Sequence, residues 1–346
     1  MQYKQRSELF SYDALRCLRN DYFHNDCQEC KDICPENAWY FERGQLRIDP
    51  GRCTNCSVCL GVCPAEALGL EFFDPNEYAM RCSEVLSCKK DLPCLSAFAS
   101  EHFVAMALKR GGIGVDLSHC AQCTLNKDGK VLASIQERLE EARAFLRALG
   151  LEAQIEERAY RNDRRSFFKT LFNAAKTMDS ASMQLPPAPD RLPIRRNLLQ
   201  QLLKPLSKDL NTSHIPTSFS FIANKQIDAA CTNCGDCVQF CPTQALLYSS
   251  DGAAISFVAG YCIDCAICND ICKADAITDT QTVDIVAWAF ARARELIRHR
   301  IEVCQECNTP FAYKGGEMVC DRCKQFVDAF GDIFKLAKDL EKGESN

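Results

Sequence analysis

Residues 231–242 have the sequence CTNCGDCVQFCP, in which four cysteines follow the order C-x2-C-x2-C-x3-C and precede a proline. CIDCAICNDIC at residues 262–272 and CTNCSVCLGVCP at residues 53–64 repeat this spacing, and CQECKDICP at residues 27–35 is a shorter copy. Three thiolates two residues apart can hold three corners of a cubane iron–sulfur cluster on one tight loop. Four such runs in one chain therefore predict iron–sulfur clusters.

The runs resemble the cysteine motifs of bacterial dicluster [4Fe–4S] ferredoxins, in which the fourth cysteine of each run ligates the other cluster. The resemblance covers two units of the chain and implies four [4Fe–4S] clusters. It assigns three complete ligand sets, which are set 2 (Cys34, Cys53, Cys56, Cys59), set 3 (Cys231, Cys234, Cys237, Cys272) and set 4 (Cys241, Cys262, Cys265, Cys268).

The remaining cluster of the first unit lacks one standard ligand. The resemblance gives it Cys27, Cys30 and Cys63. The remaining ligand would normally be a cysteine three residues before Cys27, but His24 occupies that position. We expect Cys17, ten residues before Cys27, to complete this set 1. Ligation by His24 is the alternative, and a site with three irons, or with none, is the third. Outside such a role His24 is expected to be an exposed loop residue.

Composition narrows the class of protein. The chain has 346 residues, 25 of them cysteine, and a formal net charge of -5. Nucleic-acid binding normally needs a basic surface, so we expect no nucleic-acid partner. Clustered C-x2-C spacing, and an N-terminus without a signal-peptide-like apolar stretch, predict metal ligation in a reducing compartment and hence a cytoplasmic protein. The sequence has no 18-residue apolar run, and therefore no transmembrane segment is expected.

Between the two units, residues 77–157 change to α/β periodicity. Strands are predicted at 80–87, 112–117 and 151–157, and helices at 95–109 and 132–149. The order strand–helix–strand–helix–strand predicts a small parallel sheet with right-handed crossovers.

Four cysteines follow the first two of these strands: Cys88, Cys94, Cys120 and Cys123. Ligands bind at the carboxyl ends of strands in open α/β sheets, so these thiols could hold one metal centre. The layout resembles the small iron–sulfur subunit found with some hydrogenases and heterodisulfide reductases, which implies a [2Fe–2S] centre. Zinc, a redox-active dithiol pair and inert buried thiols are the alternatives. His119 is expected to be a loop residue rather than a ligand.

Residues 158–225 are expected to connect the middle domain to the second unit. Aromatic and apolar residues at helical spacing, with arginines nearby, predict an amphipathic helix around residues 161–178. This helix either packs on its own domains or docks on a partner or an anionic membrane surface. The proline-rich stretch at residues 184–193 predicts a linker. A short helix is expected around residues 194–204.

The last part of the chain is expected to hold a second kind of metal site. Residues 283–300 are predicted to form a helix. Four cysteines then follow in the order C-x2-C-x12-C-x2-C, which are Cys304, Cys307, Cys320 and Cys323. This spacing is typical of a structural zinc ribbon. A rubredoxin-type iron is the alternative, but the glycines and prolines of rubredoxin knuckles are absent, so we expect zinc.

The sequence thus predicts an α+β multidomain protein. Its expected parts are a dicluster unit at residues 1–76, the α/β domain at 77–157, the connector at 158–225, a second dicluster unit at 226–282, and a helix with a zinc ribbon at 283–346. The expected cofactors are four [4Fe–4S] clusters, one zinc and, in the middle domain, a further iron–sulfur or metal centre.

The cysteine motifs favour electron transfer over catalysis. No nucleophile–base pair and no phosphate-binding glycine loop can be recognised. The leading interpretation is a polyferredoxin that relays single electrons between a redox enzyme and a carrier or membrane partner. One alternative is an accessory or maturation factor that docks to a molybdenum or tungsten oxidoreductase. Another is a thiol/disulfide reductase that uses Cys88, Cys94, Cys120 and Cys123. We expect a non-catalytic subunit or accessory protein that binds a catalytic redox subunit or another carrier.

Overall fold

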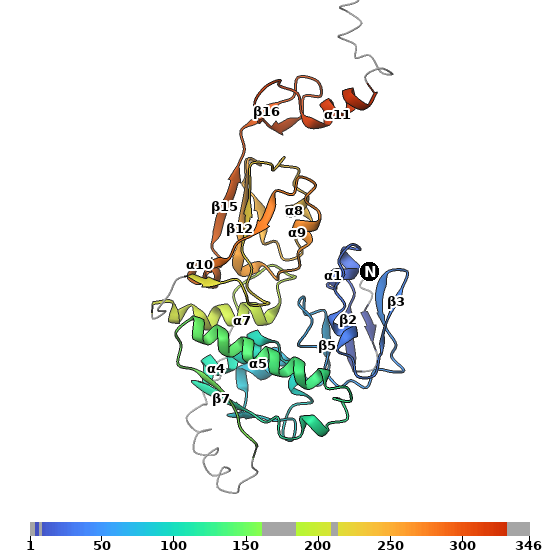
Figure 1. The fold of residues 1–346 in the computed structure, drawn as a ribbon, viewed down its shortest axis with the longest axis vertical. Helices are drawn as coiled ribbons and strands as arrows, with labels where there is room; N and C mark the ends of the chain where they lie inside the picture. The colour runs from blue at the N-terminus through green and yellow to red at the C-terminus, as the bar shows by residue number, and fades with distance from the viewer. Residues whose placement is uncertain (1–3, 7–8, 161–184, 209–213, 331–346) are drawn as a thin grey trace, which may run out of the picture.

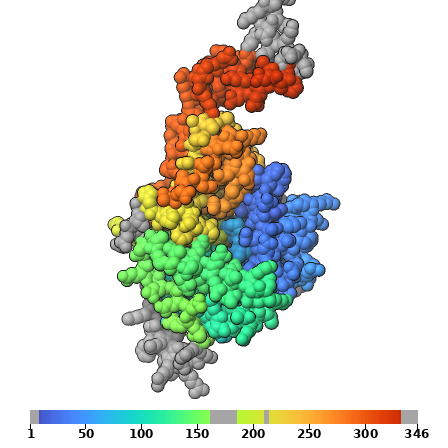
Figure 2. All heavy atoms as spheres, in the orientation of Figure 1, coloured from blue at the N-terminus to red at the C-terminus, as the bar shows by residue number. Residues whose placement is uncertain are grey.

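The computed structural model describes residues 4–6, 9–160, 185–208 and 214–330. These residues form a first unit (residues 9–76), a middle domain (77–160), a second unit (214–298) and a C-terminal module (301–330). In Figure 1 the C-terminal module and the middle domain lie at opposite ends of an elongated molecule. In Figure 2 the first unit is seated against both the middle domain and the second unit.

The first unit is built from short antiparallel strands around the cysteine loops. Its elements are β1 (Lys4–Arg6), β2 (Phe10–Asp13), α1 (Leu18–Asp21), α2 (Glu29–Asp32), β3 (Trp39–Glu42), β4 (Gln45–Ile48) and β5 (Leu68–Leu70). β1, β2 and β5 form one sheet, and β3 and β4 form a hairpin that turns at Gly44 with φ of 79°. Trp39 packs edge-to-face on Tyr12 at 5.1 Å between ring centroids, which joins the two sheets.

The middle domain is a three-stranded parallel sheet of order β6-β7-β8, which agrees with the predicted topology. Its elements are α3 (Pro75–Arg81), β6 (Val85–Leu86), η1 (Leu95–Ala97), α4 (Ser100–Arg110), β7 (Gly112–Val115), η2 (Cys120–Gln122), α5 (Lys130–Ala148) and β8 (Gln154–Glu157). α4 and α5 supply the connections between the parallel strands, and α4 ends at Gly111 in the left-handed conformation.

The strand predicted over residues 80–87 is mostly wrong. Residues 80 and 81 end helix α3, and only Val85 and Leu86 pair with β7. The helix forms because the Asp74 carboxylate accepts a hydrogen bond from the backbone N–H of Asn76, and Pro75 stands at the first helical position. This start signal lies in the sequence, before the apolar residues that suggested a strand.

The second unit repeats the architecture of the first and adds strands at both ends. Its elements are β9 (His214–Pro216), β10 (Lys225–Ile227), α8 (Asp236–Gln239), β11 (Leu246–Tyr248), β12 (Ala254–Val258), η4 (Ala259–Tyr261), α9 (Ile267–Asp270), β13 (Ile277–Asp279), β14 (Thr282–Asp284), α10 (Ile285–Ala289) and β15 (Ala293–Arg298). The sheets are β10–β13, β9–β14 and β11-β12-β15.

The helix predicted over residues 283–300 is wrong. Helix α10 is only five residues long, because the chain leaves it through Ala291, which has a positive φ of 50°. The following residues form β15, which pairs antiparallel with β12. The second unit therefore extends to residue 298, beyond the predicted boundary at residue 282.

Helix α7 (Ile194–Leu203) lies between the middle domain and the second unit (Figure 1). Arg195 and Arg196 at its start are buried, with 5% and 1% of their surface exposed. Each guanidinium Nε lies 2.6 Å from one carboxylate oxygen of Glu101, which is buried on α4. Although burial acts to raise it, the two arginines hold the pKa of Glu101 below its usual value.

This buried triad joins three parts of the molecule. Arg195 also donates to the carbonyl oxygen of Cys63 in the first unit, at 2.9 Å. Arg196 donates to the carbonyl oxygens of Phe221 and Cys262 in the second unit. The second positive charge is balanced by Glu66 of the first unit, 3.4 Å from Arg195. The region predicted to be a linker is thus followed directly by a helix that ties both units to the middle domain.

The C-terminal module contains β16 (Ile301–Val303), β17 (Pro310–Ala312) and α11 (Asp321–Phe330). β16 and β17 form an antiparallel hairpin. Lys314 donates a hydrogen bond to the carbonyl oxygen of Ala230, at 2.8 Å, and so links the module to the second unit. The amphipathic helix predicted around residues 161–178 lies outside the described residues. Among the residues that are described, no helix has the length and apolar character needed to cross a membrane.

Replacement of Glu101 by glutamine should destabilise the junction of the three parts. The substitution leaves two buried guanidinium groups with one carboxylate partner fewer, and loss of one member of a buried ion pair costs about 3 kcal/mol or more. The matched control is Glu140→Gln on α5, whose side chain is 59% exposed beside Arg143 and Arg147. Such a surface pair contributes at most about 1 kcal/mol. The urea-unfolding midpoints of both variants, measured anaerobically, test this, and equal shifts would contradict it.

Candidate metal centres

Set 1 is gathered around one cavity. Cys17, Cys27, Cys30 and Cys63 all line it. Cys17 reaches the cavity because the chain turns after β2, where the backbone N–H of Arg16 donates to the Asp13 carbonyl and Cys17 then stands just before α1. The structure therefore brings Cys17 to the other three cysteines.

His24, the alternative ligand, has a different environment. Its side chain is exposed, and its ring lies 3.8 Å from that of Phe23 and 5.5 Å from that of Tyr22, measured between centroids. Its neighbour Asn25 accepts a hydrogen bond from the backbone N–H of Cys27. The Asn25 side chain thus holds the start of the cysteine loop, while the exposed His24 ring packs against the rings of Tyr22 and Phe23.

Sets 2 and 3 are crossed as the resemblance implies. In set 2, Cys34 from the first run lines a cavity together with Cys53, Cys56 and Cys59 from the second. In set 3, Cys272 from the last run joins a cavity of about 110 Å³. The other lining cysteines of that cavity are Cys231, Cys234 and Cys237. Each cavity is otherwise lined mainly by apolar side chains, among them Phe10 and Trp39 for set 2 and Ile255 for set 3.

The cysteines of set 4 lie close enough together to shift the pKa values of one another's thiols. Burial, together with the nearby thiolate of Cys241, raises the pKa of Cys262, Cys265 and Cys268 to about 12 each. Lys225 acts in the opposite direction on the same three groups. Four thiolates so close together in a buried site need a positively charged partner, which a metal cluster supplies.

A repeated backbone hydrogen bond supports the assignment of all four sets. After each fourth cysteine, the backbone N–H of the alanine four residues later donates to the cysteine sulfur at 3.2–3.4 Å. The pairs are Ala38 to Cys34, Ala67 to Cys63, Ala245 to Cys241, and Ala276 to Cys272. The residue before each alanine has a positive φ, between 47° and 55°. N–H donors aimed at sulfur are a standard means of stabilising cluster thiolates, so the cavities fit iron–sulfur clusters.

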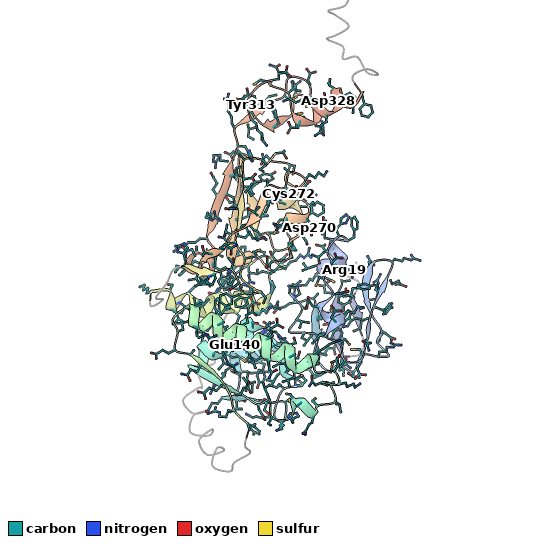
Figure 3. The ribbon with its side chains drawn as sticks, viewed as in Figure 1. Arg19, Glu140, Asp270, Cys272, Tyr313 and Asp328 are labelled. Carbon is teal, nitrogen blue, oxygen red and sulfur yellow. The ribbon has the colours of Figure 1, made fainter. Side chains whose placement is uncertain are left out.

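Sets 1 and 4 meet at the contact between the two units. Leu18, Tyr22, Ala65, Ile263 and Ile267 form a buried apolar cluster, against which Cys27 of set 1 and Cys265 of set 4 pack. The Asn25 side chain also donates to the carbonyl oxygen of Cys265 at 3.1 Å. In Figure 3 Arg19 on α1 and Asp270 on α9 mark the two sides of this junction.

Set 2 lies against the middle domain. The Ser96 hydroxyl donates to the carbonyl oxygen of Val58, in the loop that carries set 2, at 2.9 Å. Gly61 in the same loop is packed so closely that a Cβ there would overlap the Ser96 carbonyl and the Arg138 guanidinium. Burial is the main reason why the pKa of Cys94 in the middle domain is raised to about 12, and Cys56 of set 2 is among the thiols that contribute to this rise.

The four middle-domain cysteines line one cavity of about 150 Å³, near the carboxyl ends of β6 and β7. They are Cys88, Cys94, Cys120 and Cys123. The structure adds His119, which was expected to be a loop residue without a ligand role. Its Nε2 atom lies 3.4 Å from the Cys88 sulfur. The sequence feature that could have indicated a role at this site is the position of His119 directly before Cys120. The cavity thus offers four sulfur ligands and one imidazole.

The C-terminal cysteines form a different kind of site. The sulfur atoms of Cys304, Cys307, Cys320 and Cys323 all lie within 4.8 Å of one another, and those of Cys307 and Cys320 are 3.8 Å apart. A tetrahedral zinc with Zn–S bonds of about 2.3 Å requires S–S separations of about 3.8 Å. Four thiols at this spacing fit a single metal ion.

The two cysteine pairs of this site are positioned by different secondary-structure elements. Cys304 follows strand β16, whereas Cys323 lies in the first turn of helix α11, so the second cysteine pair stands at the start of a helix. Although burial acts to raise it, backbone N–H groups of Cys320 and Cys307 lower the pKa of the Cys304 thiol to about 6. A thiol in this state is ready to bind a metal.

Cys17→Ser should change the EPR signal of one cluster in the reduced protein and lower its iron content, because the structure gathers Cys17 with the other thiols of set 1. His24→Ala should leave the signal and the iron content as in the wild type, because His24 is exposed. The two variants are compared by EPR and iron analysis after anaerobic reconstitution. The opposite pattern, with His24→Ala altering the cluster, would contradict the assignment.

Cys307→Ser should remove about one zinc per chain, because a structural zinc site needs all four of its ligands. Iron content should not change, because the four cysteines that surround this site belong to none of the four sets. Zinc and iron are measured together by elemental analysis. Asn308→Ser, at the next residue, is the control and should keep its zinc. Loss of iron instead of zinc from Cys307→Ser would indicate a rubredoxin-type site.

Family models match both cysteine-rich units. Residues 23–67 and residues 223–273 each match a 4Fe-4S dicluster domain. The matched stretches lie within the first and second units and contain most of the cysteines of the four sets.

Curated relatives match shorter parts of the chain. The ferredoxin-like protein YdhX of Escherichia coli (strain K12) is 39% identical over 49 residues, which are 12% of this chain and 22% of that protein. A ferredoxin of Rickettsia felis is 30% identical over 71 residues, 19% of this chain and 65% of its own length. A ferredoxin named "7Fe" from Hydrogenibacillus schlegelii is 37% identical over 49 residues, 14% of this chain and 63% of its own length.

The chain therefore covers less than two thirds of the length of each of these relatives. The prediction of two dicluster units is confirmed by the two family matches and by the ferredoxin relatives. The chain thus contains two domains of the 4Fe-4S dicluster type in one polypeptide.

Proposed function

We propose that this protein relays single electrons between a redox enzyme and a second carrier, along one line of iron–sulfur centres. The observation that carries the proposal is the contact of cysteine sets across the boundaries of the units. The middle-domain loop with Cys94 packs on the loop of set 2, and sets 1 and 4 share a buried apolar cluster. Within each unit the crossed cysteines hold two sets together. The order is middle domain, set 2, set 1, set 4, set 3.

The chain's own residues prepare this line for electron transfer. Bound clusters supply one-electron chemistry, with potentials tuned by charge, hydrogen bonds to sulfur and solvent exposure. The alanine N–H groups donate to the sulfur atoms of the fourth cysteines. Apolar side chains such as Phe10, Leu46 and Ile255 line the cavities and exclude water. In the middle domain, the four cysteines favour a [2Fe–2S] centre.

The two ends of the line have surfaces for partners. At one end the middle-domain cavity is framed by η2 and its flanking loops. At the other end Cys234 of set 3 is exposed, and the C-terminal module is linked to the same loop through Lys314 and Ala230. We assign the first end to a catalytic redox subunit and the second to a carrier that docks beside the C-terminal module. The module would hold one zinc.

The redox state of the cysteines bears on where the relay works. All 25 cysteines lie in the described parts of the chain, and none of them forms a disulfide. Cytosolic thiols are kept reduced, whereas exported proteins form disulfides. We propose the cytoplasm as the compartment of the relay, because clustered C-x2-C spacing favours metal ligation in a reducing environment.

A thiol/disulfide reductase is the second candidate, because His119 lies 3.4 Å from the Cys88 sulfur, as a base beside a nucleophile would. However, burial raises the pKa of Cys88, whereas a nucleophilic thiol needs a lowered one. The contact therefore fits a metal ligand or its neighbour better than a catalytic pair.

A maturation factor for a molybdenum or tungsten oxidoreductase would bind the immature enzyme and leave the finished complex, whereas a relay should co-purify with it.

The test is metal analysis and EPR of the full chain after anaerobic reconstitution. Four cubanes and one [2Fe–2S] centre predict about eighteen irons, with about four per cubane and about two in the middle domain. Cys94→Ser should keep the four cubanes and lose about two irons. Cys82→Ser, at a buried cysteine outside all the proposed sites, is the matched control and should lose none.

Fewer than about twelve irons in the wild type would be too few for the four-cubane relay. A Cys94→Ser variant with unchanged iron and abolished disulfide reduction would favour the thiol enzyme instead.

A further inference from the structure

Lys225 on β10 is a buried cation in the second unit. Its side chain is 1% exposed, and its Nζ atom donates to the Asn269 side chain at 3.0 Å. It also pairs with the carboxylates of Asp279 and, at 3.7 Å, Asp264. Burial of a lysine is costly without such partners, so this one is held in place by specific contacts.

The pairing of the strands shows which positions are equivalent to Lys225. In the β10–β13 pair, Ile277 stands five residues after Cys272, the fourth cysteine of its run, and pairs with Ile227. Asp279, two residues later in the chain, pairs with Lys225. In β11–β12, the same count from Cys241 gives Leu246, and two residues further out Tyr248 pairs with Ile255. Ile255 is thus the equivalent of Lys225 within the second unit.

The same count applies to the first unit. Five residues after Cys63 stands Leu68, and two further out Leu70 pairs with Phe10. Five residues after Cys34 stands Trp39, and two further out Phe41 pairs with Leu46. Phe10 and Leu46 are therefore the equivalents of Lys225 in the first unit.

All three equivalents are buried apolar residues that line the cavity of a cysteine set. Phe10 lines the cavity of set 2, Leu46 that of set 1 and Ile255 that of set 3. Each of them is no more than 2% exposed. Lys225 holds the corresponding place at set 4, where its charge acts on the thiols of Cys262, Cys265 and Cys268. One of four equivalent positions thus carries a positive charge.

A buried positive charge favours the more negative, reduced state of a cluster beside it, because Coulomb interactions are strong where water is absent. The partner carboxylates compensate only in part, since the side chains of Asp279 and Asp264 are 56% and 43% exposed and water screens their charges. We propose that Lys225 makes the cluster of set 4 the most easily reduced of the four cubanes.

This inference rests on the proposed occupancy of set 4 by a cluster. It adds to the proposed relay the position at which the first electron comes to rest. Set 4 lies where the second unit meets set 1 of the first. With the highest potential at that point, the first electron to enter the chain rests at the junction of the units, wherever it entered. Lys225 is a positioning residue, since it acts through the cluster and touches no electron-transfer partner.

The test is a potentiometric EPR titration of Lys225→Met in the full chain. At a fixed solution potential, the reduced-to-oxidised ratio of one cluster should fall at least about tenfold, which equals about 59 mV for a one-electron couple. A Cys268→Ala variant, which disrupts set 4, identifies the signal that belongs to that cluster. Lys225→Arg should keep the wild-type ratio because it keeps the charge. Ile255→Met is the matched control at the equivalent position and should leave set 4 unchanged.

Asp279→Asn provides an independent measurement, because it removes a negative charge beside Lys225 and should raise the same ratio. If Lys225→Met binds the full iron content and all four potentials equal those of the wild type, the inference is overturned. If Lys225→Met fails to bind a cluster at set 4, the Asp279→Asn variant decides, and an unchanged reduced-to-oxidised ratio of the set 4 cluster in that variant overturns the inference. A wild type without the iron for four cubanes would instead count against the proposed function.

Discussion

The packing of the two dicluster units on the middle domain depends on one buried carboxylate. Glu101 of the middle domain accepts hydrogen bonds from both Arg195 and Arg196, and each arginine then reaches the backbone beside a cluster cysteine in a different unit. A buried ion pair is weak evidence for stability, but its directional bonds select one arrangement of the packed parts. Here that arrangement places sets 1 and 4 against a common apolar cluster, so the geometry of the proposed relay follows from a contact that involves no cysteine side chain.

Within each unit, order comes from the turn after the fourth cysteine. A residue with positive φ, three positions after that cysteine, directs the next N–H at its sulfur, and this occurs four times in the chain. None of the four residues is glycine: they are Asn37, Glu66, Gln244 and Asp275. Such a conformation is mildly strained for these residue types. The strain is tolerated because each turn forms the N–H···S bond and begins the strand that covers a cavity.

The cysteine sets could be predicted because their ligands are encoded by local spacing. Cys17 was the expected fourth member of set 1, and its approach depends on a turn after β2 that spacing does not specify. The buried role of Arg195 and Arg196 could not be predicted, since two adjacent arginines normally indicate a solvated surface and their partner Glu101 is distant in the chain. The residues of β15 were predicted to form a helix because their apolar side chains follow those of α10. Only residues 290–292, among them the left-handed Ala291, separate the two elements.

The apolar contact of Leu18, Tyr22, Ala65, Ile263 and Ile267 has a kinetic consequence. Two separate ferredoxins exchange electrons only after a collision, at a rate that depends on concentration and, through their surface charges, on salt. Units that are fixed in one polypeptide have a constant effective concentration for one another. In the proposed relay, exchange between sets 1 and 4 would then be a first-order event, insensitive to how much of the protein the cell makes or to its ionic strength. Only the two outer ends of the proposed relay would still depend on encounter.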